Sequence, residues 1–465
     1  MNEVLGNVAA SRTSRWKTPL LGSILGLCGS SVALAQASGP DTGDTAWVLT
    51  SSALVLLMTP GLALFYGGMV RTKNALSTMY QSFMAIAVVA VVWAVVGYSL
   101  MFAPDLGGGI LGGFDHVLLA GVDQQVKEGL TIPHLAFMLF QAMFAIITPA
   151  LITGAFAERV RIKAWIPFCA LWAVCVYSVV GHWVWGPGGW IAAIGGLDFA
   201  GGLVVHMTAG FSALAATYAI APRRDFNKSS ERVYNPGLIL LGTGILLFGW
   251  IGFNGGSALA SNGLASHAIA TSLFAAAAAT IGWTLVDNFR NGKMSVVGSA
   301  IGCVAGLVIV TPAAGYVTIP AALVMGFIGS IICNFAAVIV KARFNRDDTL
   351  DVFACHGVGG LFGVICTGLF ATKSVNPAGA DGLFAGSPNL LVANLQAAGA
   401  VAIFSFVATL ILIKVVNAFA RVRVEDREEI EGLDLSQHNE LVTSDTTTIP
   451  GNPTPENVKE FRKAG

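Results

Sequence analysis

Charged residues are scarce in this chain. They make up 11% of its 465 residues, whereas a soluble globular domain usually carries about 25%. Over a chain of this length, so large a deficit favours burial in a membrane. The formal net charge is +0, so charge gives no reason to expect nucleic acid or an acidic surface as a partner.

Several common functional motifs are also missing. The 7 cysteines are irregularly spaced, form no CxxC pair and lie almost entirely in apolar stretches. That pattern favours small core residues over a zinc site or a disulfide framework. GxSxG and HExxH do not occur, and a filter of repeated carbonyl loops is absent. We therefore expect neither an enzyme nor a simple cation channel, and neither a metal nor a cofactor.

What the chain has instead is apolar sequence, which makes up 55% of its residues. A helix needs about 20 apolar residues to cross the hydrocarbon core, and eleven such runs occur. Runs this long predict helices rather than barrel strands, and glycines inside them permit close helix packing. The predicted spans are 45–70, 76–103, 133–157, 164–185, 200–221, 235–257, 266–288, 295–312, 319–340, 350–371 and 391–419.

The loops between these runs differ sharply in charge. Fourteen Lys and Arg residues fall in the loops after the first, third, fifth, seventh and ninth runs, whereas the even loops hold only Lys127 and Lys373. Positively charged loops tend to stay in the cytoplasm. The alternation therefore predicts an outer N-terminus and a cytoplasmic C-terminus, and it supports the number of eleven spans.

The two ends of the chain differ from its apolar middle. Residues 1–37 carry a basic leader, an apolar run and a small-x-small pattern at Ala35–Ala37, which is typical of a secretory signal peptide. An uncleaved anchor helix is the alternative. Residues 38–420 hold the eleven spans, and residues 421–465 form a charged tail.

Ionisable residues inside the runs are few, because each costs about 2.5–3.5 kcal/mol near the bilayer centre. Two pairs stand out: Asp198 with His206 in the fifth run, and Asp351 with His356 in the tenth. Each of these runs closes a set of five, and since five is odd the second set would run opposite to the first. The pattern predicts an inverted five-plus-five repeat followed by a long last span, with the histidines at the repeat interface. Packing is the alternative role for each ring.

Aromatic residues form the second feature. Phe140 and Phe144 are one turn apart in the third run. Trp250, Phe253 and Ser257 share one face of the sixth run, because they are spaced i, i+3 and i+7. Such stripes are more often ordinary core packing, so they do not establish a site by themselves.

Several long segments together resemble the Amt/Rh ammonium transporters. They are TPGLALFYGGMVRTKN at 59–74, TGAFAERVR at 153–161, LDFAGGLVVHMTAG at 197–210, WIGFNGGSA at 250–258 and DVFACHGVGG at 351–360, in the order that the family has them. The likeness covers nearly all of residues 45–440. The segment EGLDLSQHNE at 431–440 is similar to the tail motif of the bacterial Amt branch.

This resemblance implies an outer site that recruits ammonium. The site would fall on Trp185, Ser257 and Phe144, with Asp198 behind it. Phe144 and Phe253 would form a gate of paired aromatic rings below that site. The resemblance gives these roles; the spacing of the residues does not.

The resemblance also implies a pore lined by His206, His356 and Trp250, with Asp351 and Phe140 in support. Ammonium would lose its proton and cross as ammonia through the hydrophobic pore. Conduction of the neutral gas and net transport of ammonium both remain open, as does a sensing role that would need a partner.

Family members are trimers, which implies a homotrimer in the inner membrane, in contact with lipid and with no nucleic-acid partner. The tail motif implies a PII-type regulatory protein at the cytoplasmic face. Two departures from the family pattern bear on these expectations. Asn439 stands where the family tail has glycine, and Pro149 falls inside the third run.

Overall fold

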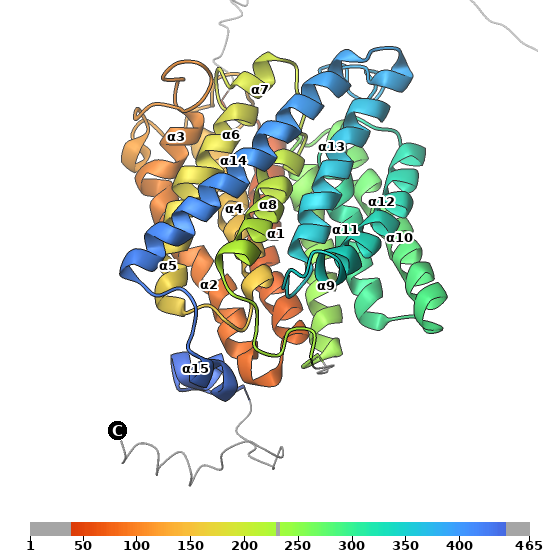
Figure 1. Ribbon diagram of the computed structural model, residues 1–465. Coiled ribbons are helices and arrows are strands. Elements are labelled where there is room, and N and C mark those ends of the chain that lie inside the picture. The colour runs from red at the N-terminus through yellow and green to blue at the C-terminus, as the bar shows by residue number, and fades with distance from the viewer. Residues whose placement is uncertain (1–38, 229–232, 443–465) are drawn as a thin grey trace, which may run out of the picture. The chain divides into compact units, whose positions relative to one another are not determined.

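The computed structural model describes residues 39–228 and 233–442 (Figure 1). The predicted signal peptide lies outside these residues. Within them the chain is helical, with isolated bridges and no strand. In these two stretches, ten helical segments are long and apolar enough to span a membrane, and a shorter apolar helix makes the eleventh. The predicted all-helical membrane fold is thus confirmed.

The first five spans contain several local changes of helix type. They are α1 (Thr42–Met69); α2 (Ala75–Val92) continued by the π-helical turn η2 (Trp93–Gly97) and α3 (Tyr98–Phe102); α4 (His134–Ile152) with η4 (Thr153–Phe156); α5 (Ile162–Trp172), η5 (Ala173–Tyr177) and α6 (Ser178–Trp185); and η6 (Gly202–Met207) with α8 (Thr208–Ala219). The short helix α7 (Trp190–Ala193) follows α6. α4 continues through Pro149 as one helix.

The remaining spans have fewer interruptions. They are α9 (Pro236–Gly256), α10 (Gly263–Asn291), α11 (Val296–Val310), α12 (Ile319–Ala342), η7 (Phe353–Val358) with α13 (Gly359–Phe370), and α14 (Asn389–Phe419). Short 3-10 turns occur at η1 (Thr72–Asn74), η3 (Val117–Leu119) and η8 (Leu383–Ala385), and the tail forms α15 (Asp426–Glu431) and η9 (Asp434–His438).

Side-chain caps explain where several spans begin. The side chains of Asp41, Asn235, Asn262, Ser295 and Thr318 each accept a backbone N–H in the first turn of the helix that follows. Such caps satisfy donors that the helix itself leaves free. Each of these spans therefore starts next to a capping residue that can be recognised in the sequence, and this locates its start to within a few positions.

The eighth span is shorter than the sequence predicted. α11 has 15 residues, fewer than the run 295–312 from which it was expected. It begins after the Ser295 cap and ends before Thr311 and Pro312, after which the backbone turns. A proline cannot continue the hydrogen bonding of a helix, so the run contains more apolar residues than the helix uses.

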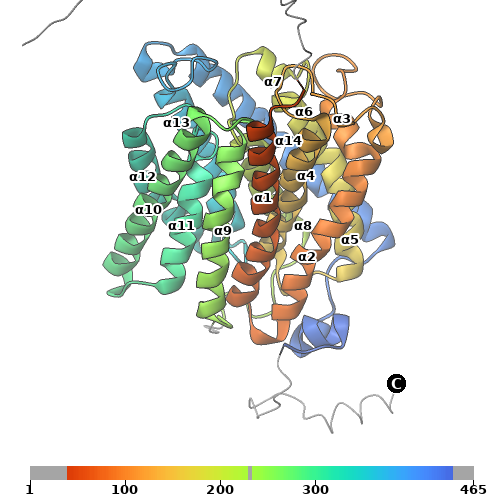
Figure 2. The same ribbon diagram turned by 180° about the vertical axis from the view of Figure 1, so that it is seen from behind.

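The two ends of the helix bundle are easily told apart. Residues 421–442 pack at one end, which we call the tail face, and the opposite end is the far face (Figures 1 and 2). α3, α6 and α7 lie at the far face, and α15 lies at the tail face. The basic loops after α1, η4 and α8 contact the tail and so lie at the tail face too.

The first and second halves of the bundle meet along α1 and α9, which pack side by side (Figure 2). The contact is close because glycines replace side chains there. A Cβ on Gly242 would lie 2.5 Å from the backbone nitrogen of Phe65, and one on Gly61 would lie 2.6 Å from the side chain of Ile245. Small residues let membrane helices approach in this way. α14 crosses obliquely over α8 (Figure 1).

Candidate functional site

The two predicted pore histidines meet inside the bundle. His206 lies in η6 and His356 in η7, and their side chains are buried. Their Nδ1 atoms are 3.2 Å apart, with ring centroids separated by 5.3 Å. One ring must donate this hydrogen bond and the other accept it, since a neutral imidazole has one nitrogen for each purpose.

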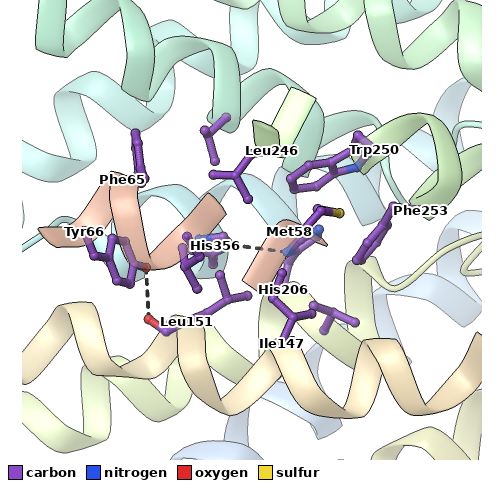
Figure 3. A pocket seen from close by; sticks show the side chains of 13 residues that line it. Met58, Phe65, Tyr66, Ile147, Leu151, His206, Leu246, Trp250, Phe253 and His356 are labelled. Atoms are coloured by element: carbon purple, nitrogen blue, oxygen red, sulfur yellow. Dashed lines mark hydrogen bonds between the residues drawn. The ribbon is translucent and has the colours of Figure 1, made fainter. Parts of the chain in front are cut away.

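A narrow apolar cavity surrounds the histidine pair (Figure 3). Its volume is about 20 Å³. Among the described residues, His206 Nε2 is a buried ring nitrogen without a hydrogen-bond partner. Polar lining is therefore confined to a few atoms, and the other walls are hydrophobic. The lining comprises Met58, Leu62, Phe65, Tyr66, Ile147, Leu151, Val205, His206, Leu246, Trp250, Phe253, Val304 and His356.

Aromatic rings stack above the pair on the side of the far face. The rings of Trp250 and Phe253 lie nearly parallel to that of His206, with centroids 5.6 Å and 6.0 Å away. Trp250 is fixed because its Nε1 donates to Thr311 Oγ1 at 3.0 Å. Phe144 contacts Phe253 at 4.4 Å between centroids. The structure thus brings the two predicted gate rings together, directly over the histidines.

Two further aromatic rings contact Phe144, one of them from the predicted outer site. Trp185 meets it edge to face at 6.2 Å, and Phe140 meets it from the same helix at 4.9 Å. The hydroxyl of Ser257 donates to the carbonyl oxygen of Phe253 at 2.7 Å. Its oxygen lone pairs are then free to accept a hydrogen bond from a ligand.

Asp198 holds the start of η6. Its carboxylate accepts four backbone N–H groups, from Gly201, Gly202, Leu203 and Val204, at 2.6–3.2 Å. Trp185 Nε1 donates to the backbone carbonyl of Asp198 at 2.9 Å. The buried carboxylate is therefore fully occupied with N–H donors.

The matching acid in the second half is Asp348, not Asp351. Asp348 lies eight residues before His356, as Asp198 lies eight before His206. Its carboxylate accepts the N–H groups of Val352 and Phe353 at the start of η7, at 3.0 Å and 2.8 Å. The pairing of Asp351 with Asp198, made from the sequence, is thus corrected: Asp351 instead forms an ion pair with Lys341 at 2.7 Å.

The backbone repeats this correspondence. Gly201 and Asp351 each lie three residues after the capping acid, and both have positive φ, at 119° and 59°. Each is followed by a π-helical turn that carries the histidine. The signal for Asp348 was present in the sequence as the equal spacing of eight, but Asp351 lay closer to the predicted helix start.

A buried ion-pair network closes the tail face below the site. Glu158 accepts from Arg71 and from Arg223, and Asp347 accepts from Arg159 and Arg223. Although burial raises the pKa of Glu158, the bonds and charge of Arg71 and then Arg223 lower it below its usual range. These acids are therefore ionised, and their loops are held together by charge-assisted bonds.

The tail attaches to the same end of the bundle. The carboxylate of Asp434 accepts the N–H groups of Leu76 and Ser77 at 3.0 Å and 2.7 Å, next to the first turn of α2. Lys73 donates to the carbonyl oxygens of Glu429 and Ile430. The motif at 431–440 thus docks on the loop after α1, which the sequence did not predict.

Comparison with known proteins agrees with this arrangement. The family described as the Ammonium Transporter Family matches residues 46–443. The chain belongs to this family. It is 47% identical over 405 residues to an ammonium transporter of Bacillus subtilis (strain 168), covering 87% of this chain and 99% of the relative. It is therefore a multi-pass membrane protein of a transporter family and not an enzyme.

Solved structures share the fold. Saccharomyces cerevisiae Mep2 superimposes with a TM-score of 0.81 at 33% identity, covering 89% of this chain and 94% of that one. A structure named Sensor Amt Protein gives a TM-score of 0.79 at 28% identity, covering 85% and 98%. The recognition of an ammonium transporter from its motifs is thus confirmed.

Proposed function

We propose that this chain transports ammonium across a membrane. Ammonium would be recruited at the far face, lose a proton, and cross as ammonia past His206 and His356. Membership of the Ammonium Transporter Family supports the substrate. The observation that carries the route is the buried histidine pair in an apolar cavity, reached beneath stacked aromatic rings.

Recruitment uses groups that can recognise an N–H cation. The indole face of Trp185 attracts positive charge, and the oxygen of Ser257 accepts a hydrogen bond from the ion. The Asp198 carboxylate adds a negative charge behind them. Potassium has a similar charge but donates no hydrogen bond, so Ser257 discriminates between the two ions.

Energetics favour deprotonation before crossing. A cation–π contact contributes about 0.5–2 kcal/mol, whereas a charge near the bilayer centre costs about 2.5–3.5 kcal/mol even on lenient scales. The outer site alone cannot offset that cost in an apolar cavity. Neutral ammonia avoids it, and Phe144 and Phe253 keep the path dry where the proton is lost.

The two histidines would form hydrogen bonds with ammonia after it has passed the gate. Because Nδ1 of each ring is used in the mutual hydrogen bond, the Nε2 atoms remain for the substrate. His206 Nε2 has no other partner in the described part of the chain, which agrees with a vacant hydrogen-bonding position for ammonia. The same chain of nitrogens offers a path for the released proton, which would make transport electrogenic.

The cellular setting follows from the same proposal. A homotrimer in the inner membrane would place the far face outside and the tail face in the cytoplasm, where a PII-type regulator could bind. Residues 1–37 would be removed as a signal peptide. Reporter fusions in the loop around Arg223 should report a cytoplasmic location, and an external location would overturn this orientation.

Sensing is the second candidate function. The likeness to the structure named Sensor Amt Protein favours it specifically. A sensor would pass its signal to an output protein at the tail face. A sensor would bind ammonium with little flux, whereas a transporter would carry it.

Current and uptake in proteoliposomes separate these candidates. Purified full-length protein should give an ammonium-evoked current with uptake of the substrate, and potassium at the same concentration should give none. The variant with His206→Leu and His356→Leu serves as the matched control. Saturable binding without flux would support sensing and would contradict the transport proposal.

A further inference from the structure

A third buried histidine lies near the outer site and has no role in the route described above. His182 is in α6, three residues before Trp185, and its side chain is fully buried. Its Nδ1 lies 2.8 Å from the carbonyl oxygen of Met101, and its Nε2 lies 3.1 Å from Asp105 Oδ1. α3, which carries Met101, and α6 lie side by side at the far face (Figure 1).

The two partners of His182 fix its protonation. A backbone carbonyl oxygen only accepts hydrogen bonds, and an ionised carboxylate also only accepts. Both ring nitrogens must therefore donate, which requires an imidazolium. Asp105 is the ionised partner, because the N–H of Gly109 first, and then His182, hold the pKa of its carboxyl below the usual range.

This ion pair fastens a loop onto the end of α6. The second oxygen of Asp105 accepts the N–H of Gly109 at 3.1 Å. The carbonyl oxygen of Gly109 in turn accepts the N–H of Trp190 at 3.1 Å, and Trp183 Nε1 donates to the carbonyl oxygen of Ile110 at 2.9 Å. Residues 105–110 are thus attached to α6 and α7 at several points, and only the His182–Asp105 contact is ionic.

The end of α6, to which this loop is attached, is also the segment that carries Trp185. The N–H of Gly186, directly after Trp185, donates to the carbonyl oxygen of His182 at 3.0 Å. A Cβ on Gly186 would lie 2.3 Å from His182 Nδ1 and 2.4 Å from the oxygen of Met101. The backbone next to Trp185 therefore packs directly against the histidine ring, while the indole itself is tied to Asp198.

We propose that His182, as an imidazolium paired with Asp105, is a positioning residue that sets the indole of Trp185 over Phe144 for recruitment of ammonium. This inference rests on the proposed transport function. Neither His182 nor Asp105 lines the cavity around His206 and His356. The His182–Asp105 ion pair therefore acts on recruitment through Trp185 and leaves the deeper path unchanged.

The kinetic test compares the concentration dependence of ammonium-evoked current in proteoliposomes. Asp105→Asn keeps an acceptor oxygen but removes the charge that holds the imidazolium. We expect the half-saturating ammonium concentration to rise about tenfold, as for loss of one charge-assisted hydrogen bond. The maximal current should stay within about twofold of the wild type, because the path beyond Phe253 is intact.

Asp115→Asn is the matched control, because Asp115 is an exposed acid in the same loop. It should leave both kinetic parameters unchanged. The positioning role is refuted if Asp105→Asn keeps the wild-type half-saturating concentration. If maximal current is lost at the same time, the variant has general damage to the fold rather than a misplaced Trp185.

A spectroscopic test addresses the charge independently of transport. With ¹⁵N-labelled histidine, the ring nitrogens of His182 should both resonate as protonated nitrogens at neutral pH. The signal is assigned by its loss in His182→Gln, or by its shift in Asp105→Asn if the first variant does not fold. A neutral His182 ring in the wild type would overturn the ion pair.

The two proposals fail in different ways. A wild-type protein that carries no ammonium current would refute the transport proposal and leave the spectrum to test the ion pair. Normal wild-type current together with an unaffected Asp105→Asn variant would refute only the positioning role.

Discussion

Gly210 marks the closest approach between the two helices that carry the pore histidines. It lies in α8, one turn after His206. A Cβ at this position would lie 2.0 Å from the backbone nitrogen of Gly357 and 2.3 Å from its Cα. Ordinary contact with a Cβ begins at 3.4 Å, so Gly210→Ala requires the two backbones to separate by about 1.4 Å.

That separation acts directly on the histidine pair. Gly357 follows His356, so a shift of its backbone moves the ring as well. A displacement of this size along the line between the rings would lengthen the 3.2 Å between the Nδ1 atoms beyond the reach of a hydrogen bond. Overpacking costs about 1–3 kcal/mol. We therefore expect Gly210→Ala to fold with a lowered thermal midpoint and to lose most of its ammonium current.

Thermal unfolding in detergent and current in proteoliposomes measure the two effects separately. Gly399→Ala is the matched control, since Gly399 lies within α14 and a Cβ there meets nothing within 4 Å. It should keep the wild-type current. Full current in Gly210→Ala would show that contact between the two rings is not needed for transport.

Four further outcomes are expected. Asp198→Asn should abolish current and Asp198→Glu should retain some, because only the charged variant still stabilises a cation; equal activity in both would leave Asp198 a capping role alone. Replacing His206 and His356 together by leucine should leave a folded oligomer, seen by gel filtration, without electrogenic transport. Burial, and then the charge of Asp351, raise the pKa of Asp348 from 3.8 to about 7. Between these two pH values the unfolded chain binds fewer protons than the folded protein does. The folded state should therefore lose stability as pH rises from about 4 to about 7. Over that pH range the thermal midpoint of Asp348→Asn should fall less than that of the wild type. Equal pH dependence in the two proteins would contradict the raised pKa of Asp348. Removing residues 421–465 should alter transport or regulator binding, measured in vesicles and by pull-down, while the oligomer stays intact.

The arrangement of spans was largely predictable because its signals are local. Length, hydropathy and loop charge each report on a few neighbouring residues, and together they placed the spans within a few positions. α11 is the shortest of these helices, and its ends at Val296 and Val310 also lie within two positions of the predicted run.

The contacts of the site were harder to predict, because they join residues far apart in the chain. Spacing placed Trp250 and Phe253 on one face of α9, but it did not show that their rings stack on His206. Asp351 was named and Asp348 overlooked, because an apolar run does not reveal that the backbone at Asp351 has a positive φ. The Asp105–His182 pair was missed altogether, since Asp105 lies in a loop without a motif.

The π-helical turns at Gly202–Met207 and Phe353–Val358 have a consequence for chain length. A π turn contains more residues than an α-helical turn, so it amounts to one residue inserted into a regular helix. Deleting a single residue in either segment would restore the α-helix and change the direction of the side chains within the turn, including that of the histidine. One ring could then no longer face the other. These two six-residue stretches therefore cannot lose a residue without moving a histidine of the pair.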